Sequence, residues 1–169
     1  MDAADLPPAT LDKAWPLFGL RLRTARLELR LPTDDDLLTL LDVARAGIHG
    51  PDEMPFASTW STLPSPAFER GYLVYHWANR SGWTPESWEI GLAASLDGQL
   101  IGMQGMHARS FASSRTVHTG SWVGRAFQGR GLGKEMRLAA LALAFVGLGA
   151  HLAETEAFLD NVASNAVSR

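Results

Sequence analysis

The stretch Gln128-Gly129-Arg130-Gly131-Leu132-Gly133-Lys134 decides the fold of this chain. It follows an apolar segment around Val123 and opens a helical pattern that runs from Gly131 to Val146. Alternate glycines remove the side chains that would keep a ligand away from the backbone. The first turn of the helix adds free N–H groups and a partial positive charge, which favour an anion such as a diphosphate. Residues 122–137 are therefore predicted to form a strand, a diphosphate-binding turn and a helix.

Two better-known phosphate motifs do not fit this stretch. A P-loop needs glycine at position 128 and serine or threonine at position 135, where the chain has Gln128 and Glu135. A dinucleotide fingerprint starting at Gly129 needs glycine at position 134, where the chain has Lys134. The remaining alternative is a connector without a ligand. A mere connector, however, needs neither alternate glycines nor the basic rim that Arg130 and Lys134 supply.

The composition is that of one ordinary soluble domain, with 169 residues, 46% of them hydrophobic and 20% charged. A formal net charge of −3 gives no general attraction to nucleic acid or to an anionic membrane. The absence of cysteine excludes disulfides, thiolate metal sites and a cysteine nucleophile. No apolar run approaches the roughly 18 residues that span a bilayer, and the N-terminus, with Asp2 and Asp5, lacks the pattern of a signal peptide. We therefore expect a cytoplasmic protein that binds neither nucleic acid nor membrane.

Hydrophobic periodicity predicts the order strand, helix, helix, three strands, helix, strand, helix. The predicted strands are 27–31, 88–95, 99–107, 116–124 and 151–158, and the predicted helices begin near residues 34, 66, 131 and 161. Thr33 is expected to cap the first helix. This order predicts an α/β (α+β) fold with a mixed central sheet and helices on both faces. Residues 1–20 are predicted to be a flexible arm, and residues 21–169 a single domain.

A family resemblance rests on four segments of the chain. Gln128, Gly131 and Gly133 fill the fixed positions of the pattern Gln/Arg-x-x-Gly-x-Gly/Ala. That pattern resembles the acyl-CoA signature of the GNAT family of N-acetyltransferases. Three further segments resemble the branch of the family that acetylates ribosomal-protein N-termini, namely Gly120-Ser121-Trp122-Val123, the opening from Leu22 to Arg30, and Asp160-Asn161-Val162-Ala163-Ser164-Asn165. The resemblance covers residues 22–169.

The resemblance implies a role for each matching residue. The amides around Trp122 and Val123 would pair with the pantetheine arm of acetyl-CoA, and one of them would polarise the thioester carbonyl. The diphosphate would be held by the turn, which consists of Gln128, Gly129, Arg130, Gly131, Leu132, Gly133 and Lys134. Asn161, together with Ser164, would contact the cofactor from the other side. The implied reaction is direct attack of a primary amine, on a small molecule or a protein N-terminus, on the thioester.

The resemblance also nominates a base and an acid. Glu156 lies five residues before Asn161, where some family members carry their base, and it shares a strand face with Glu154. The alternative is that both carboxylates line a solvated edge. Ser164, three residues after Asn161, would protonate the departing thiolate, because the tyrosine of many family members is replaced here by Ser168. The alternative for Ser164 is an ordinary polar position in the first turns of a helix.

Two histidines and four tryptophans leave alternatives open. His107 and His118 fall on neighbouring predicted strands and are expected to face each other, and His118 is an alternative base. No third ligand is placed by spacing, so no metal is expected. A further group of residues would line either the acceptor pocket or the core, namely Trp60, Trp77, Trp83 and Trp88.

The C-terminal end departs from the family pattern. Family members continue after the position of Arg169 with two more strands, which are absent from this sequence. A sheet that stops here would show an unpaired edge, which favours a homodimer. The departure also keeps a second function open, namely a non-catalytic acyl-CoA-binding sensor or assembly module of the same fold.

Overall fold

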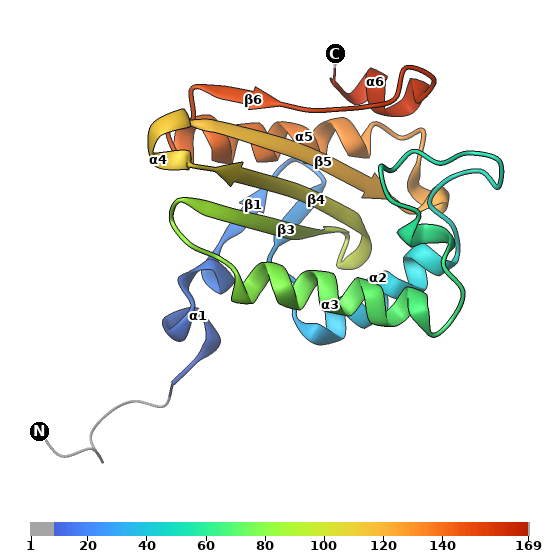
Figure 1. Ribbon diagram of the computed structural model, residues 1–169, viewed down its shortest axis with the longest axis horizontal. Coiled ribbons are helices and arrows are strands. Elements are labelled where there is room, and N and C mark those ends of the chain that lie inside the picture. Colours follow the sequence, from blue (N-terminus) through green and yellow to red (C-terminus); the bar gives the residue numbers. More distant parts are fainter. Residues whose placement is uncertain (1–8, 169) are drawn as a thin grey trace, which may run out of the picture.

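The computed structural model describes residues 9–168 and contains one mixed six-stranded sheet in the order β1-β2-β3-β4-β5-β6 (Figure 1). The strands are β1 Arg21–Arg23, β2 Leu27–Arg30, β3 Ser87–Leu96, β4 Gln99–Arg109, β5 Thr116–Val123 and β6 Leu152–Glu154. Neighbours pair antiparallel from β1 to β5, whereas β5 and β6 pair parallel. The parallel step requires a crossover, which the chain makes through the helix after Val123.

Helices cover both faces of this sheet. They are α1 Leu11–Ala14, α2 Asp34–Arg45, α3 Ala67–Ser81, α4 Phe111–Ser114, α5 Leu132–Ala142 and α6 Val162–Ser168. Helix α5 continues into a π-helical turn, Leu143–Gly147. Helices α2 and α3 lie on one face and α5 on the other (Figure 1). The predicted mixed sheet with helices on both faces is confirmed.

The core divides into two clusters because strand residues alternate between the faces. Trp88, Ile90 and Leu92 of β3 pack on the α5 side with Met136 of α5. Ala93 belongs instead to the cluster under α2 and α3, which the two helices complete with Leu37, Leu40, Phe68 and Tyr72. The sheet is thus buried on both faces over β3 and β4, which fixes the register of the strands that follow.

The predicted cap of α2 is a complete capping box. The Thr33 hydroxyl accepts from the Asp36 N–H (3.2 Å), and the Asp36 carboxylate accepts from the Thr33 N–H (2.6 Å). Arg30 adds two hydrogen bonds to the same carboxylate. These donors hold the pKa of Asp36 below its usual value, although burial acts in the opposite direction. The helix therefore begins at the residue that the sequence indicates.

Three segments differ from the sequence-based expectation. β6 spans Leu152–Glu154 and not 151–158, because threonine hydroxyls replace the ladder after Glu154. The loop expected after β4 contains the short helix α4. Of the expected arm 1–20, residues 1–8 lie outside the described residues, whereas Trp15 packs edge-on against Trp83 with ring centroids 6.0 Å apart. No helix within residues 9–168 is long and apolar enough to cross a membrane.

Candidate functional site

A gap opens in the sheet where β5 and β6 part. Their last paired residues are His118 and Glu154, and β5 continues to Val123 with β4 as its one strand partner. The Thr119 hydroxyl donates to the Glu154 carbonyl (3.2 Å), and the Thr155 hydroxyl donates to the Thr119 carbonyl (2.9 Å). These side-chain bonds close the ladder, so the strands separate beyond them. The closed end of the gap lies at Thr119, and the open end lies beyond Val123.

The free edge of β5 in this gap presents backbone groups. In an antiparallel ladder, successive residues turn their N–H and C=O groups alternately to one neighbour and then the other. The Gly124 N–H donates toward β4 (2.8 Å), so the N–H groups of Val123 and Ser121 turn away from β4 and into the gap. The Thr119 carbonyl fits this alternation, since it accepts from Thr155 on the β6 side. An extended ligand could therefore pair with β5 like an added strand.

The glycine-rich turn lies at the open end of the gap. Gly129 and Gly131 have φ angles of +72° and +75°, a conformation that suits glycine. Gly131 is the N-cap of α5 and supplies no side-chain cap, so the first N–H groups of α5 have no intrahelical partner. A helix N-terminus of this kind attracts negative charge. The geometry is therefore that of an anion-binding turn, as the sequence indicates.

Gln128 fastens this turn to its surroundings. Its side-chain amide donates to the Val123 carbonyl (2.7 Å) and to the Ile48 carbonyl (2.9 Å). The Arg125 N–H donates to the Gly47 carbonyl (2.9 Å), which ties the same two segments together a second time. The glutamine thus holds the end of β5 and the loop after α2 in place, which is a structural role within the motif.

A second fastening comes from the segment that runs from Leu22 to Arg30, whose contact with the turn the sequence did not predict. Glu135 in the first turn of α5 accepts from the Thr24 hydroxyl (2.5 Å) and from the Arg26 N–H (3.0 Å). The Arg26 guanidinium pairs with the same carboxylate (2.6 Å) and donates to the Arg130 carbonyl (3.1 Å). Hydrogen bonds from Thr24 and then Arg26 lower the pKa of Glu135. Only the mismatch of Glu135 with a P-loop drew attention to this position in the sequence.

Basic residues surround the turn and also reach the closed end of the gap. Arg130 and Lys134 are exposed on the rim of the turn. Arg137, one helical turn further along α5, donates to the Thr119 hydroxyl (2.6 Å). Burial lowers the pKa of Arg137. A half-buried guanidinium therefore lies directly behind the point where the strands separate.

Helix α6 places Asn161 and Ser164 beside α5. The Asn161 side-chain oxygen accepts from the Ser164 N–H (3.0 Å), so Asn161 caps α6. A Cβ atom at Gly133 would lie 3.3 Å from Cγ2 of Val167, so α6 packs closely against the first turn of α5. Both Asn161 and Ser164 are half-buried. The structure thus packs the helix that Asn161 caps, and that carries Ser164, against the helix that follows the glycine-rich turn.

The tryptophans that sequence grouped as a pocket wall are separated by the structure. Trp60, in the connection between α2 and α3, has its ring centroid 6.2 Å from that of Trp122 on β5. Trp88 is buried in the core on the other face of the sheet. Trp83 packs under the N-terminal segment, and Trp77 is exposed on α3. Trp60 is therefore the tryptophan of that group that lies beside β5.

Four polar residues cross the sheet at the closed end of the gap. The His107 and His118 rings are stacked, with centroids 4.9 Å apart and planes at 8°, as their expected positions on neighbouring strands imply. Glu154 lies beyond His118, and Glu89 beyond His107. No group of three or more histidines, cysteines or carboxylates in residues 9–168 is arranged to hold a metal ion.

Glu156, the carboxylate nominated as base, lies just past β6. It is exposed and keeps the alternation of Glu154, so both carboxylates belong to the same face. It is close enough to His107 to act on the pKa of that imidazole. The structure therefore places Glu156 two residues past Glu154, in the segment that leads from β6 to α6.

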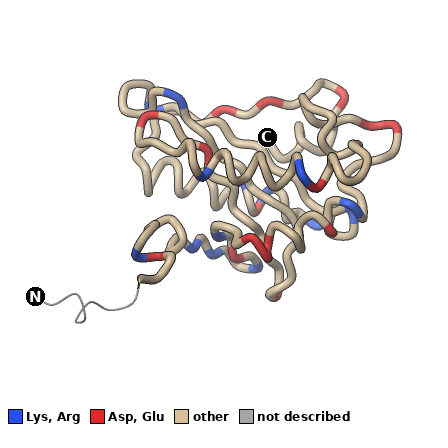
Figure 2. Tube along the Cα trace, turned by 60° about the horizontal axis from the view of Figure 1, so that its bottom comes forward, with Lys and Arg blue, Asp and Glu red and all other residues tan. Residues whose placement is uncertain are grey.

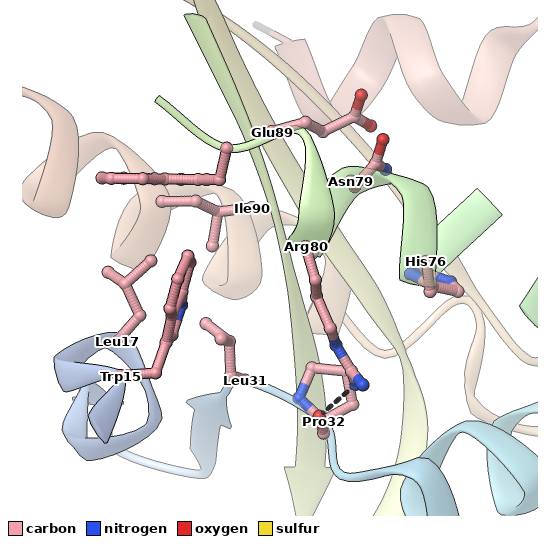
Figure 3. A pocket seen from close by; sticks show the side chains of 11 residues that line it. Trp15, Leu17, Leu31, Pro32, His76, Asn79, Arg80, Glu89 and Ile90 are labelled. Atoms are coloured by element: carbon pink, nitrogen blue, oxygen red, sulfur yellow. Dashed lines mark hydrogen bonds between the residues drawn. The ribbon is translucent and has the colours of Figure 1, made fainter. Parts of the chain in front are cut away.

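A separate cavity lies between the N-terminal segment, the end of α3 and β3 (Figure 3). Trp15, Leu17 and His76 line it, and Arg80 crosses it to donate to the Pro32 carbonyl (2.7 Å). Burial lowers the pKa of His76 to about 4. Glu89, the outermost of the polar residues at the closed end of the gap, also lines the cavity, whereas β5, β6 and the glycine-rich turn contribute none of its lining residues, so the cavity belongs to the packing of the N-terminal segment.

Comparison with known proteins gives a family and a set of structural neighbours. The family model described as an acetyltransferase (GNAT) domain matches residues 26–169. Among solved structures, RimJ of Mycobacterium smegmatis in complex with a CoA disulfide has a TM-score of 0.70, with 18% identity over 88% of this chain and 71% of that one. A Vibrio cholerae protein provisionally named a ribosomal-protein-serine acetyltransferase has a TM-score of 0.65, with 24% identity over 89% of this chain and 81% of that one.

A third neighbour is the ribosomal-protein-S5-alanine acetyltransferase of Vibrio fischeri. Its TM-score is 0.64, with 14% identity over 88% of this chain and 79% of that one. At these identities the likeness establishes a shared fold. The family match covers the glycine-rich turn, the gap and α6 together.

Proposed function

Because the chain belongs to the GNAT family of N-acetyltransferases, we propose that it transfers an acetyl group from acetyl-CoA to a primary amine. The observation that carries this proposal is the parting of β5 and β6 directly in front of an uncapped helix N-terminus. The gap suits an extended amide-containing arm, and the turn suits a diphosphate. One ligand that contains both groups is coenzyme A.

In this proposal, the backbone of β5 holds the donor. The N–H groups of Ser121 and Val123 pair with the pantetheine arm, while the side chain of Trp122 packs beside it. The diphosphate binds the turn between Gln128 and Lys134, where backbone amides and the charges of Arg130 and Lys134 meet it. Asn161 contacts the arm from α6. Contacts within the protein already hold three of these groups, namely the carbonyls of Val123 and Arg130 and the side chain of Asn161.

The proposed chemistry is a direct displacement. The amine nitrogen bonds to the thioester carbon, the carbon–sulfur bond breaks, and the sulfur keeps the electron pair as a thiolate. A backbone N–H of β5 stabilises the oxyanion that forms between these events. Glu156 takes the proton that the neutral amine loses and later passes it to water, and Ser164 donates its hydroxyl proton to the sulfur and takes a replacement from water. The products are an N-acetyl amide and free coenzyme A.

The proposed acceptor is a small-molecule amine or a protein N-terminus. Support for the second comes from structural neighbours named as acetyltransferases of ribosomal proteins. A ribosomal-protein acceptor would go with a cytoplasmic location. Carboxylates at the closed end of the gap, among them Glu154 and Glu156, suit any acceptor that arrives with a positive charge.

Calorimetry and a thiol-release assay test the proposal together. We expect acetyl-CoA to bind and free thiol to appear with at least one member of a panel containing peptides with free N-termini, polyamines and aminoglycosides. N-terminally blocked peptides without lysine serve as the negative control. Absence of acetyl-CoA binding at millimolar concentration would refute the proposal. Binding without turnover on any amine would favour the alternative of a non-catalytic acyl-CoA sensor.

Matched variants test the proposed acid and base. We expect Glu156→Gln and Ser164→Ala to lower kcat by tenfold or more, with little change in acetyl-CoA affinity. Asp160→Asn and Ser168→Ala are the matched controls, since they make the same chemical changes a few residues away in the same exposed segment and in the same helix. Equal kcat values in a test variant and its control would remove that residue from the mechanism.

A homodimer is the proposed assembly. In residues 9–168, β6 stands at the edge of the sheet with a strand partner on one side alone. Such an edge favours pairing with another chain. Light scattering coupled to size-exclusion chromatography should give twice the 18.3 kDa mass of the chain. A monomer at tens of micromolar protein would contradict this part of the proposal.

A further inference from the structure

Three glycines stand side by side across the middle of the sheet and form a glycine row. Gly91 of β3 pairs with Gly105 of β4, and Gly105 pairs with Gly120 of β5. Ala93 and Met103, two residues along the same strands, belong to the core cluster under α2 and α3. Because side chains alternate between the faces of a sheet, the glycine row lies on the face that carries these two helices (Figure 1).

The glycine row is covered at one end and bare at the other. A Cβ atom at Gly91 would lie 2.9 Å from Cε of Met103 and 3.5 Å from Cε1 of His76, so side chains fill that end. A Cβ atom at Gly105 would meet only the Gly120 carbonyl oxygen, at 3.3 Å. At Gly120 it would meet no atom of residues 9–168 within 4 Å. The backbone of Gly105 and Gly120 is therefore open from this face.

Large side chains border the bare backbone on both sides. Two residues away on one side are the stacked rings of His107 and His118. Two residues away on the other side of Gly120 is Trp122, whose ring lies 6.2 Å from that of Trp60. Residues on one face of a strand are about 7 Å apart along it. A residue without a side chain therefore leaves a furrow about one chain wide between its neighbours.

The furrow ends at the gap between β5 and β6. Gly120 follows Thr119, where hydroxyl bonds close the ladder, and precedes Ser121, whose N–H turns into the gap. The other end of the furrow meets His76 of α3 over Gly91. A molecule in the furrow would thus lie across the strands, with one end at the backbone groups that the gap exposes.

Glycines in the interior of a sheet need an explanation. A strand glycine weakens the sheet, because it loses backbone entropy on folding and packs no side chain against its neighbours. Such a position is used where another backbone or a ligand approaches closely. No part of residues 9–168 fills the space over Gly120. The furrow is therefore shaped for a molecule from outside the described chain.

The outer border of the gap carries acidic charge. Residues 152–168 contain Glu154, Glu156 and Asp160 and no lysine or arginine. Figure 2 shows these positions in red along β6 and the segment after it (Figure 2). Carboxylates repel an anion, so a molecule without negative charge suits this end of the furrow.

From these observations we infer that Gly105 and Gly120 determine which acceptor is used, and that the acceptor is a primary amine on an unbranched chain. The amine lies over Gly120 at the gap, and its chain crosses Gly105 toward α3. The inference rests on the proposed function, because the furrow serves the same transfer. A linear diamine and a peptide that begins with glycine share this chemistry. A ring or a branch beside the amine would meet His118 or Trp122.

The length of the furrow limits where a branch matters. Neighbouring strands are about 4.8 Å apart, so the open part over Gly120 and Gly105 is about 10 Å long. An extended peptide rises about 3.4 Å per residue. The furrow thus holds about the first three residues of a peptide acceptor, and we expect a branch beyond them to have little effect.

Gly120→Val is the direct test, and Gly71→Val is its matched control. A Cβ atom meets nothing within 4 Å at either position, and Gly71 is exposed on α3. Valine also suits a strand, so Gly120→Val should keep the wild-type Tm. We expect it to lower kcat/KM for a glycine-first peptide by about twentyfold or more, and Gly120→Ala to have a smaller effect in the same direction. The control should match wild type.

Binding measurements separate the furrow from the donor site. Calorimetry with acetyl-CoA should give the same affinity in wild type, Gly120→Val and Gly71→Val within about twofold. Calorimetry with the glycine-first peptide, on protein saturated with coenzyme A, should show loss of peptide binding in Gly120→Val alone. Wild-type peptide binding in Gly120→Val would overturn the inference.

A series of acceptors tests the substrate class on the wild-type protein. The probes are 1,4-diaminobutane, a glycine-first peptide, the same peptide with valine first, and an aminoglycoside. We expect an unbranched probe to exceed the branched and cyclic ones in kcat/KM by about tenfold or more. Turnover of the diamine alone would identify a small-molecule source, and turnover of the peptide alone a protein N-terminus. Equal kcat/KM for the glycine-first and valine-first peptides would overturn the inference.

The two levels of proposal fail in different ways. A wild-type protein that binds acetyl-CoA but acetylates no amine refutes the proposed catalysis. A wild-type protein that acetylates amines, beside an equally active Gly120→Val variant, refutes the role of the glycine row alone.

Discussion

The open end of the β5–β6 gap is lined by backbone, whereas its closed end is lined by side chains. At the open end, Gly129 and Gly131 expose main-chain amides that two fastenings, through Gln128 and through Glu135, keep in place. At the closed end, four strands each contribute one polar side chain to a row that contains His107 and His118. The first end can bind a ligand by geometry alone, and the second end can also change its charge with pH.

This difference has a consequence for experiment. Changes at the open end should act on cofactor affinity and be nearly independent of pH, because backbone amides do not titrate. Changes at the closed end should act on turnover and depend on pH. The predictions below test that separation, beginning with the largest expected effect.

Gly131→Val should abolish most of the cofactor affinity. A β-branched residue at φ +75° is strained, and relief of that strain would move the amides away from the diphosphate. We expect acetyl-CoA binding to weaken at least a hundredfold, about 3 kcal/mol, in calorimetry. Gly98→Val is the matched control, because Gly98 has φ +81° in the β3–β4 turn. Equal affinities in the two variants would show that backbone geometry at the open end is unimportant.

A buried histidine near the closed end should make the fold, and not the chemistry, sensitive to acid. Burial lowers the pKa of His76 to about 4, so folded protein holds it neutral while unfolded protein protonates it below about pH 6.5. Stability should therefore be complete above pH 6.5 and fall by about 2 kcal/mol as the pH drops toward 4.5.

His76→Phe should remove most of this loss, as measured by urea unfolding at each pH. Carboxyl groups whose pKa is lowered, such as those of Asp36 and Glu135, contribute stability that is lost only at lower pH. Unchanged acid sensitivity in His76→Phe would contradict the assignment.

Gln128→Ala should weaken acetyl-CoA binding about tenfold and lower stability by about 1–2 kcal/mol. The side-chain amide bonds two carbonyls, those of Val123 and Ile48, and its removal leaves both without that donor. Gln99→Ala, at the exposed start of β4, is the control. Wild-type affinity in Gln128→Ala would mean that the turn keeps its shape without this fastening.

The smallest effect is expected for the clamp between Arg26 and Glu135. A double-mutant cycle to alanine should give a coupling energy of about 1 kcal/mol, or a few degrees in Tm, that decreases at high salt. The Arg23–Glu28 pair is the control, with side chains 75% and 34% exposed against 46% and 15% in the clamp. A larger coupling in the control would overturn the view that the clamp fastens the turn.

Local patterns were enough to predict most elements of the fold. Thr33 followed by three aspartates marked the start of α2, and Asp97-Gly98 marked the turn between β3 and β4. The length of β6 could not be predicted, because two hydroxyl hydrogen bonds decide it. Thr119 donates to the Glu154 carbonyl, and Thr155 donates to the Thr119 carbonyl. Such contacts join residues more than thirty positions apart and leave no local period.

The two ends of the gap also differ in how far the sequence could predict them. The glycine-rich turn was visible in the sequence because all of its residues are consecutive and each acts through the backbone. Arg26 was not, since its clamp depends on a partner more than a hundred residues away. The facing of His107 and His118 followed from their places on neighbouring strands, whereas Glu89 and Glu154 joined them only through register.

The sequence by itself determined the family, the turn and the helix that follows it, because glycine conformation and helix capping are properties of a few adjacent residues. Tertiary structure alone decided where β5 and β6 separate, which carboxylate lies beside His118, and which tryptophan lies beside β5. Those outcomes depend on the register of four strands. A shift of one residue in any of them would turn its side chains to the other face of the sheet.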